Sequence, residues 1–481
     1  MACVSDGRPA GRAAGAGRHV SCVIGGMTTA ALASMRADLA GFRAAIADVP
    51  VIDEPALVRL RSRDFFWFSP ILKAQLQRKS ADLVVCPRDE ADVVVVARAA
   101  ARHRVPVTVR GAGTGNYGQA VPLEGGIVLD MTDMTAIEWQ RPGVVRVQPG
   151  KKLVDLDAET RPAGWEQRMH PSTKRTATIG GFVAGGSGGV GSVTYGGLRE
   201  PGNILGARVV TLEPEPRVLE LRDDAAQKVC HAYGTNGIIT AVEMATAPAL
   251  AWIDVLVAFD ELSQAVACGH AVALADGIVK KLLTPVAWPV PTYFKGLEQA
   301  CPEGRSLLIA MVAEPSLAPF EAMVAARGGS VTYRAPTEEG PGARPLYELT
   351  WNHTTLHALK VDKEITYLQS LFPVDRTLAA IAEIEALLGD QAMGHYEFVR
   401  YNGVVAAVGL PLVRFTTEER LRAMIALHQQ HGVMIADPHV TSLEGGSGHM
   451  RADIDQLGFK HEADPLGLMN PGKMTSFTAR G

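Results

Sequence analysis

The sequence predicts an α+β protein with more than one domain, and three observations support this class. The chain has 481 residues, more than one ordinary hydrophobic core accommodates. Residues 82–109 have the pattern of a strand, a helix and a second strand that opens into a glycine-rich loop. From about residue 250, strands and amphipathic helices alternate as in an antiparallel sheet with helices packed on one face.

The N-terminal half divides into a tail, a helical stretch and the strand–helix–strand unit. Residues 1–35 are rich in Ala, Gly and Arg without periodicity, and we expect them to be disordered or outside the fold. Residues 36–80 carry apolar side chains at helical spacing. Asp89 predicts the N-cap of a helix ending near His103. Strands are predicted at 83–86, 105–109, 126–131, 144–150 and 207–213, and a helix at 152–165.

In the second half, apolar runs predict strands, and segments with helical periodicity separate them. The strands are expected to form an antiparallel sheet with the helices packed on one face. The predicted strands are WIDVLVAF (252–259), SLLIAMVA (306–313) and VVAAVGLPL (404–412), and the predicted helices cover 262–275, 318–326 and 418–432.

Composition indicates a globular protein that acts on a small molecule. Hydrophobic residues make up 47% of the chain and charged residues 20%, with a net charge of −4, which argues against nucleic acid or an anionic membrane as the main partner. The six cysteines are scattered without a CxxC pair, so we expect no disulfide framework, no zinc knuckle and a cytoplasmic location. No apolar run predicts a membrane span. A homodimer is left open.

RGAGTGNYG (110–118) places four glycines directly after a predicted buried strand. Glycines permit positive φ and let backbone N–H groups approach a ligand, so this loop suits a phosphate. It is not a Walker A loop, because it has no lysine, and it is not a Rossmann fingerprint, because Pro122 and two glycines follow where a helix would be needed. From this loop alone, an ordinary connection with structural glycines fits equally well.

TATIGGFVAGGSGGVGSVTYGG (176–197) holds nine glycines and strengthens the ligand interpretation. Such a tract loses much conformational entropy on folding, which a large flat ligand along the backbone would offset. The tract is too glycine-rich for a stable helix. A flexible linker is the alternative, but linkers do not usually interleave Ile, Phe, Val and Tyr with glycine.

Taken together, these segments resemble the FAD-binding domain of the vanillyl-alcohol oxidase / p-cresol methylhydroxylase (PCMH-type) superfamily, in particular its FAD-linked oxidase branch with D-lactate and glycolate dehydrogenases. The resemblance implies a two-part FAD-binding domain (36–248), an α+β cap domain with an antiparallel sheet (249–436) and a C-terminal segment (437–481) that returns to the flavin. The matching pieces are VVCPRDEADV, VPVTVRGAGTGNYGQAV, GGIVLDMTDMTAI, VRVQPG, ATIGGFVAGGSGGVGSVTYGGLREPGNILGARVV, YGTNGIIT and DPLGLMNPGKM.

The resemblance also implies which residues hold the FAD. The first loop would bind the pyrophosphate, the second segment the flavin and ribityl chain, the GIIT motif the adenine, and the tail motif the flavin ring. In that order, the implied residues are Arg110, Gly111, Ala112, Gly113, Thr114, Gly115, Asn116 and Gly118; Pro171, Ser172, Thr178, Gly180, Gly181, Gly185, Gly188 and Gly189; Gly237, Ile238 and Ile239; and Asn470 and Lys473.

We predict a non-covalent FAD. Several relatives link the flavin to a histidine of the first loop, but this chain has Thr114 there, no histidine from 104 to 169 and no cysteine between Cys86 and Cys230. His170, just before the flavin-facing Pro171, is the remaining candidate for a covalent link.

The predicted reaction is hydride transfer from an alcohol or 2-hydroxyacid to the flavin N5, followed by reoxidation by oxygen or another acceptor. His439, His449, Arg400 and Tyr401 are the predicted catalytic residues, with Arg400 as a clamp for a substrate carboxylate. No metal is predicted, although the spacing of His353 and His357 leaves one open. Two alternatives remain: an NADPH-dependent reductase related to UDP-N-acetylenolpyruvoylglucosamine reductase, and a non-catalytic protein that keeps the FAD fold.

Overall fold

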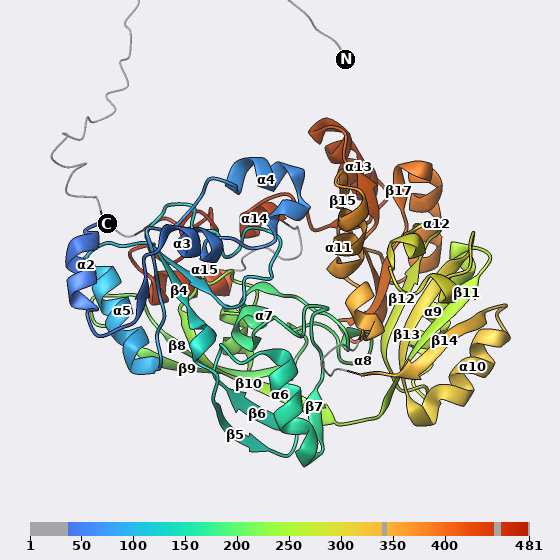
Figure 1. The fold of residues 1–481 in the computed structure, drawn as a ribbon, viewed down its shortest axis with the longest axis horizontal. Helices are drawn as coiled ribbons and strands as arrows, with labels where there is room; N and C mark the ends of the chain where they lie inside the picture. The colour runs from blue at the N-terminus through green and yellow to red at the C-terminus, as the bar shows by residue number, and fades with distance from the viewer. Residues whose placement is uncertain (1–36, 339–343, 447–453, 480–481) are drawn as a thin grey trace, which may run out of the picture. The chain divides into compact units, whose positions relative to one another are not determined.

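The computed structural model describes residues 37–338, 344–446 and 454–479, and the chain from Ala37 to Gly481 forms one compact unit (Figure 1). Within it, helices and strands are mixed as the sequence predicts for an α+β protein. The tail expected over residues 1–35 lies outside the described residues. The domain boundaries at 248/249 and 436/437 stay predictions, because the contacts do not divide the unit there.

The first sheet has the strand order β1-β2-β4-β3, and β2, β4 and β3 run parallel. Parallel neighbours need a crossover, and α5 provides the one from β2 to β3. The Asp89 carboxylate accepts a hydrogen bond of 2.9 Å from the Asp92 N–H, which confirms the predicted N-cap. The elements are α2 (Leu39–Ala45), β1 (Val51–Ile52), α3 (Pro55–Arg61), α4 (Pro70–Leu76), β2 (Leu83–Val85), α5 (Glu90–Arg102), β3 (Val107–Arg110) and β4 (Ile127–Asp130).

The second sheet is antiparallel, with the order β5-β6-β10-β8-β9 and β7 paired to the end of β10. Its inner face packs on α6 and α7 through Val147, Leu156 and Phe182. The elements are β5 (Ile137–Arg141), β6 (Val144–Val147), α6 (Leu153–Thr160), β7 (Trp165–Gln167), α7 (Ile179–Gly185), α8 (Ser192–Tyr195), β8 (Ile204–Val210), β9 (Val218–Arg222) and β10 (Ile238–Pro248).

Helix α7 corrects one expectation, since the second glycine segment was judged too glycine-rich for a stable helix. The Thr178 hydroxyl accepts a hydrogen bond of 3.3 Å from the Gly181 N–H and caps the helix. Ile179, Phe182 and Val183 are buried on one side of it. Packing of these apolar residues therefore outweighs the low helix propensity of the glycines.

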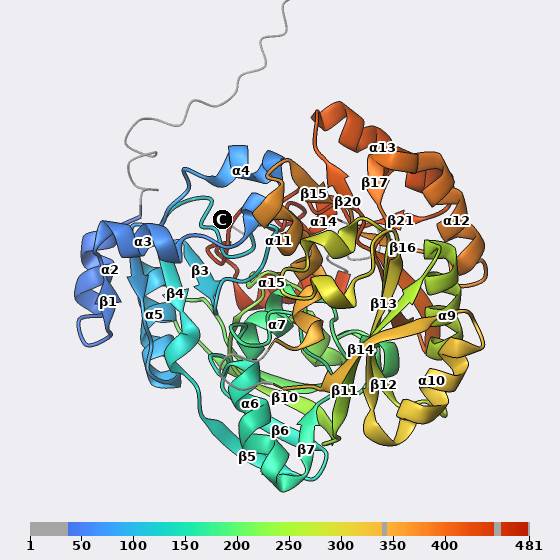
Figure 2. The same cartoon turned by 45° about the vertical axis from the view of Figure 1, so that its right-hand side comes forward.

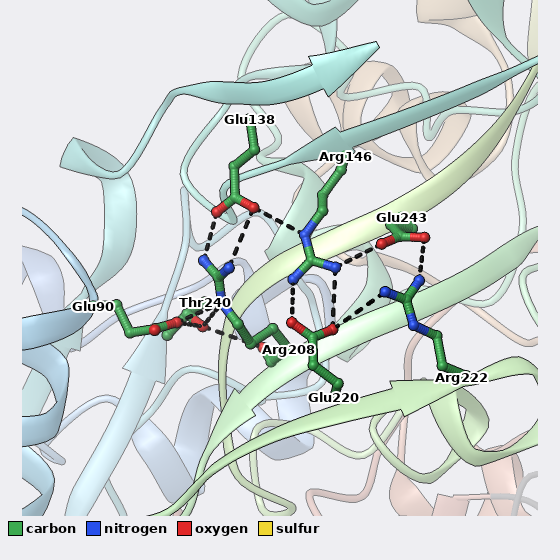
Figure 3. Close-up of polar contacts among 8 residues, drawn as sticks. All are labelled: Glu90, Glu138, Arg146, Arg208, Glu220, Arg222, Thr240 and Glu243. Atoms are coloured by element: carbon green, nitrogen blue, oxygen red, sulfur yellow. Dashed lines mark hydrogen bonds and ion pairs between the residues drawn. The ribbon is translucent and has the colours of Figure 1, made fainter. Parts of the chain in front are cut away.

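A network of charged side chains covers the outer face of the second sheet (Figure 3). Arg146 of β6 lies at its centre and pairs with carboxylates from three other strands, at 2.9 Å to Glu138, 2.5 Å to Glu220 and 2.6 Å to Glu243. Arg208 extends the network to α5, because its guanidinium lies 2.5 Å from Glu90. The network therefore joins the two sheets of the N-terminal half.

Replacing Arg146 by methionine is expected to lower the free energy of unfolding by roughly 2–3 kcal/mol. The change leaves three carboxylates without their shared partner. Breaking a fully buried ion pair lowers the free energy of unfolding by about 3–5 kcal/mol. The loss here should be smaller, because two of the three carboxylates are partly exposed. The matched control is Arg222→Met, whose half-exposed side chain also pairs with Glu243 and should cost below about 1 kcal/mol. Urea unfolding of the FAD-saturated proteins measures both, and equal losses would contradict a central role for Arg146.

The third sheet, of order β12-β13-β11-β14, is antiparallel as expected. Its side chains alternate between two cores. Val255 and Val257 pack towards α9 and α10, whereas Leu256 and Ala258 pack towards the side where α11 lies. Helices thus cover both faces, not one (Figure 2). The elements are β11 (Trp252–Phe259), α9 (Leu262–Leu274), β12 (Lys280–Val286), β13 (Ser306–Ala313), α10 (Leu317–Ala325), β14 (Ser330–Pro336) and α11 (Asn352–Val361).

Two smaller antiparallel sheets complete the cap, with the orders β15-β20-β17 and β18-β19-β16-β21. The strand expected over 404–412 is broken, because β19 ends at Gly409 and β20 begins at Leu412 in a different sheet. The elements are β15 (Ile365–Tyr367), β16 (Ser370–Leu371), α12 (Thr377–Leu388), β17 (Ala392–Met393), β18 (Tyr396–Tyr401), β19 (Val404–Gly409), β20 (Leu412–Arg414), α13 (Glu418–Gln430) and β21 (Met434–Ile435).

The C-terminal segment returns to the first sheet, as the resemblance implies. After α14 (Leu443–Gly446) and α15 (Ile454–Ala463), the chain runs beside β3. The Val107 N–H donates to Leu468 O at 2.8 Å, and the Asn470 N–H donates to Val107 O at 2.7 Å. Among the described residues, no helix is both long and apolar enough to cross a membrane.

Candidate functional site

One large pocket is lined by both glycine segments and by residues of the cap, and its empty volume is about 1610 Å³ with the open solvent at its mouth included. On the cap side it reaches Trp351, Asn352, His353, Gln369 and Leu410. The predicted FAD residues that line it are Arg110, Gly111, Ala112, Gly113, Thr114, Gly115, Asn116, Pro171, Ser172, Thr178, Gly180, Gly181, Gly185, Gly188, Gly237 and Ile239.

The first glycine loop folds around the side chain of Arg110, the last residue of β3. The guanidinium donates to Ala112 O at 3.1 Å and to Arg63 O. Gly113 has φ +68°, and a Cβ there would lie 2.1 Å from this guanidinium. A side chain at position 113 would therefore be strained and would displace the Arg110 guanidinium.

The two glycine segments touch each other. A Cβ on Gly111 would lie 2.2 Å from the Thr178 hydroxyl, and a Cβ on Gly180 would lie 2.4 Å from Pro149 Cβ. At Gly185 the situation differs, since the only atom within 4 Å of a Cβ would be Gln119 Nε2, at 3.7 Å. Gly185 therefore opens onto the pocket, whereas Gly111 and Gly180 allow backbone segments to approach.

These features fit a dinucleotide. Two bare stretches of main chain form the wall, and Arg110 is a buried cation beside them whose Nε has no hydrogen-bond partner among the described residues. Burial lowers the pKa of Arg110. A phosphate oxygen would supply the missing acceptor, and the apolar part of the wall suits a flat ring system.

The remaining predicted FAD residues, Gly118, Gly189, Ile238, Asn470 and Lys473, do not line the pocket. Lys473 Nζ donates to Gly118 O at 2.6 Å, and Asn470 Nδ2 donates to Gln119 O at 2.7 Å and to Tyr233 O at 2.6 Å. The tail motif thus does not face the pocket. Asn470 holds the backbone of the lining residues Gln119 and Tyr233. Lys473 holds the backbone of the neighbouring Gly118.

Asp64 lines the pocket and was not predicted. It accepts hydrogen bonds from the Phe66 N–H at 3.0 Å and the Ala120 N–H at 3.3 Å. Burial raises the pKa of Asp64 to about 6 and lowers that of Lys473 to about 7, while the attraction between the two charges opposes both shifts. No sequence motif marks this aspartate, because its partner at the pocket, the Ala120 N–H, lies in the loop that follows Gly118.

Neutral polar groups form another part of the lining. Tyr117 OH donates to Gln369 Oε1, and Asn116 Nδ2 donates to Tyr367 OH at 2.8 Å. Burial raises the pKa of Tyr117 to about 12, so this phenol is neutral at pH 7. The hydrogen bonds connect the first glycine loop to the cap strand β15 and the residues after it.

The three predicted catalytic residues that the structure describes do not line this pocket. Buried His439 has both ring nitrogens engaged, Nδ1 at 2.8 Å from Ser69 Oγ and Nε2 at 3.0 Å from Tyr367 O. Arg400 pairs with Asp276, and Tyr401 packs in an apolar cluster beside Leu371. His449 lies outside the described residues. The structure therefore brings none of the three described residues to the lining.

Among the other histidines, His231 and His353 line the pocket and His357 does not. The His357 ring packs edge-on against Phe294 with 6.3 Å between ring centroids. No group of three or more His, Cys, Asp or Glu in the described part of the chain could hold a metal ion. His170, the candidate for a covalent flavin link, is buried against Tyr347 and does not line the pocket either.

Comparison with known proteins also finds an FAD binding domain and FAD-linked relatives. Residues 81–221 match the family described as FAD binding domain. An uncharacterised FAD-linked oxidoreductase of Mycobacterium tuberculosis is 31% identical over 207 residues, 41% of this chain and 44% of that protein. Glycolate oxidase subunit GlcD of Escherichia coli is 34% identical over 210 residues, 41% of each protein. D-lactate dehydrogenase of Archaeoglobus fulgidus is 37% identical over 118 residues, 24% of this chain and 26% of that protein.

These matches span less than half of each relative. Among solved structures, an alkyldihydroxyacetonephosphate synthase superposes with a TM-score of 0.65 over 88% of this chain and 82% of that chain, at 17% identity, and so shares the fold. The resemblance drawn from the glycine motifs is confirmed for residues 81–221, which match the FAD binding domain family, and this match together with the FAD-linked relatives supports FAD as the cofactor.

Proposed function

We propose that the protein is an FAD-dependent oxidoreductase that oxidises an alcohol or a 2-hydroxyacid, with oxygen or another acceptor reoxidising the flavin. One observation carries the proposal: a single pocket runs from the two glycine segments to cap residues such as Trp351 and Gln369. FAD held along the glycine segments would supply a two-electron hydride acceptor at the cap end. The cap residues would then bind and orient the donor.

The pocket lining bears on the choice between the two donor classes. Arg110 is the only arginine or lysine among the described lining residues, and its guanidinium already donates to two carbonyls of the chain. A substrate carboxylate would therefore rely on neutral donors such as the Asn352 amide, since the single proton of Tyr117 OH already goes to Gln369. The relatives named after glycolate and D-lactate keep 2-hydroxyacids in the proposal beside neutral alcohols.

An anaerobic screen of the FAD-loaded protein tests the function. The panel contains glycolate, D-lactate and D-2-hydroxyglutarate as 2-hydroxyacids, and benzyl alcohol and 1-butanol as neutral alcohols. We expect at least one of them to bleach the flavin absorbance and NADPH alone to leave it unchanged. Admission of air then shows whether oxygen restores the colour. Bleaching by NADPH without any alcohol would overturn the proposal.

A further inference from the structure

We propose that His353 accepts the hydroxyl proton of the substrate on its Nε2 atom. The inference rests on the proposed function, because it names the proton acceptor of that same oxidation. His353 stands in the first turn of α11 and lines the pocket that the glycine segments also line.

Hydrogen bonds from the cap fix the start of α11. Trp351, the residue before the helix, has φ 53° and ψ −141°, a conformation that residues other than glycine rarely adopt. Its N–H donates to Glu397 Oε1 at 2.6 Å, and that oxygen lies 3.0 Å from His395 Nε2. Glu397 and His395 are fully buried, so water cannot take their place. His353, two residues further on, is held at the pocket wall by this support.

The tautomer of His353 follows from its one hydrogen bond within the described residues. Nδ1 lies 3.2 Å from Glu348 O, and a carbonyl oxygen can only accept, so Nδ1 carries the proton. The lone pair is then on Nε2. No described residue makes a hydrogen bond to Nε2. A polar atom without a partner is either fully buried or accessible, and Nε2 is not fully buried, so it is accessible.

His353 is in the form that can accept a proton at neutral pH. Burial, followed by the charges of His357 and Lys360, lowers its pKa to about 4, and only the Glu348 carbonyl acts in the other direction. The carboxylate of Glu348 is engaged with Arg175 at 2.6 Å. The imidazole is therefore neutral at pH 7.

The proton balance of the reaction requires such a group. Oxidation converts the C–O single bond of the carbinol into C=O, removing a hydride from carbon and a proton from oxygen. Bound FAD would accept the hydride with both electrons of the C–H bond, and the proton goes to His353 Nε2, which becomes imidazolium. The hydroxyl becomes more acidic as the hydride leaves, and the neutral imidazole accepts its proton as the C=O bond forms. The proton returns to solvent when the product leaves.

His353→Asn tests the inference. The asparagine amide can still donate to Glu348 O, while the Nε2 acceptor is lost. We expect flavin bleaching by the panel compound that reduces the wild type fastest to slow by about 100- to 1000-fold, since general-base groups contribute at least this much. FAD affinity should stay within two-fold. The matched control is His357→Asn, one turn later in α11 and outside the pocket lining, which should keep the wild-type bleaching rate.

Added imidazole separates a chemical from a structural role. In His353→Ala, imidazole should restore part of the bleaching rate, in proportion to its unprotonated concentration. A bleaching rate for His353→Asn within three-fold of the wild type, or no rescue of His353→Ala by imidazole, would overturn the inference and leave the proposed function intact. A wild-type flavin that no alcohol of the panel bleaches would overturn both.

Discussion

Replacing Gly185 by alanine is expected to weaken FAD binding by about 10- to 100-fold while the apoprotein remains as stable as the wild type. In the protein alone, the added methyl group would meet only Gln119 Nε2, at an ordinary contact distance of 3.7 Å. Its φ is not in the left-handed region, so alanine adopts this backbone without strain. With FAD in the pocket, the methyl would occupy space that the ligand needs, and overpacking of this kind costs about 1–3 kcal/mol.

The matched control is Gly458→Ala. Gly458 lies inside α15, where a Cβ would meet nothing within 4 Å, and it does not line the pocket. Both alanines replace a helical glycine and should leave the unfolding free energy of the apoprotein unchanged or raise it by about 0.5–1 kcal/mol. FAD titration of the apoproteins, followed by flavin fluorescence, measures affinity. Equal affinities for the two variants would show that FAD does not pass Gly185.

The cofactor pocket could be predicted from the sequence because its main determinant is local. Glycine differs from every other residue by the missing Cβ, and this difference is visible in the sequence wherever backbones must approach. Gly111 and Gly180 allow such approaches, and Gly113 adopts positive φ, in segments 60–70 residues apart that line the same pocket. Helix α5 and the strands β2 and β3 beside it were also predictable, because the N-cap of the helix and the apolar runs of the strands are local features of the sequence.

The catalytic side of the pocket was not predictable, because the role of a polar side chain depends on its partners. The sequence predicts His439 as a catalytic residue and gives His353 only the spacing of a possible metal ligand with His357. In the structure, Ser69 and Tyr367 engage both nitrogens of His439, whereas His353 keeps one nitrogen accessible at the pocket. Asp64 likewise reaches the pocket through bonds to a loop more than fifty residues away.

The prediction of secondary structure was wrong where tertiary contacts override the local helix or strand propensity of the sequence. The glycines of α7 have low helix propensity, but burial of Ile179 and Phe182 stabilises the helix. The apolar run over 404–412 reads as one strand, yet the chain leaves the sheet at Leu410. That residue lines the pocket, and its carbonyl lies 3.2 Å from His395 Nδ1. Both departures bring residues to the FAD pocket, which no pairing rule for strands or helices anticipates.

The second prediction concerns the strained residue before α11: Trp351→Gly is expected to be more stable than Trp351→Ala by about 1–2 kcal/mol. At ordinary positions alanine is the more stable of the two, because glycine gives the unfolded chain more conformational freedom. At φ 53° and ψ −141° a residue with a Cβ is strained by about 1–3 kcal/mol, and glycine is not. Both variants lose the same indole contacts with Leu371 and Val399, so the difference isolates the backbone.

Trp252 provides the matched control, since it is a half-buried tryptophan at the start of β11, where the backbone is extended. There the usual order should hold, with Trp252→Ala more stable than Trp252→Gly. Urea unfolding of the four FAD-saturated variants gives the comparison. The same order at both positions would contradict strain at Trp351 and, with it, the idea that Glu397 holds the residue in place.

Activity of the glycine variant then separates two roles of Trp351. Its ring edge lies against the second glycine segment, since a Cβ on Gly188 would come within 3.7 Å of Trp351 Cη2. Trp351→Gly removes this wall but keeps the N–H that donates to Glu397, so α11 should begin at the same place and hold His353 as before. We therefore expect KM for the alcohol to rise about ten-fold, as for one lost apolar wall in a binding pocket, with kcat within three-fold of the wild type. A large loss of kcat with unchanged KM would mean that the indole itself positions the reacting groups.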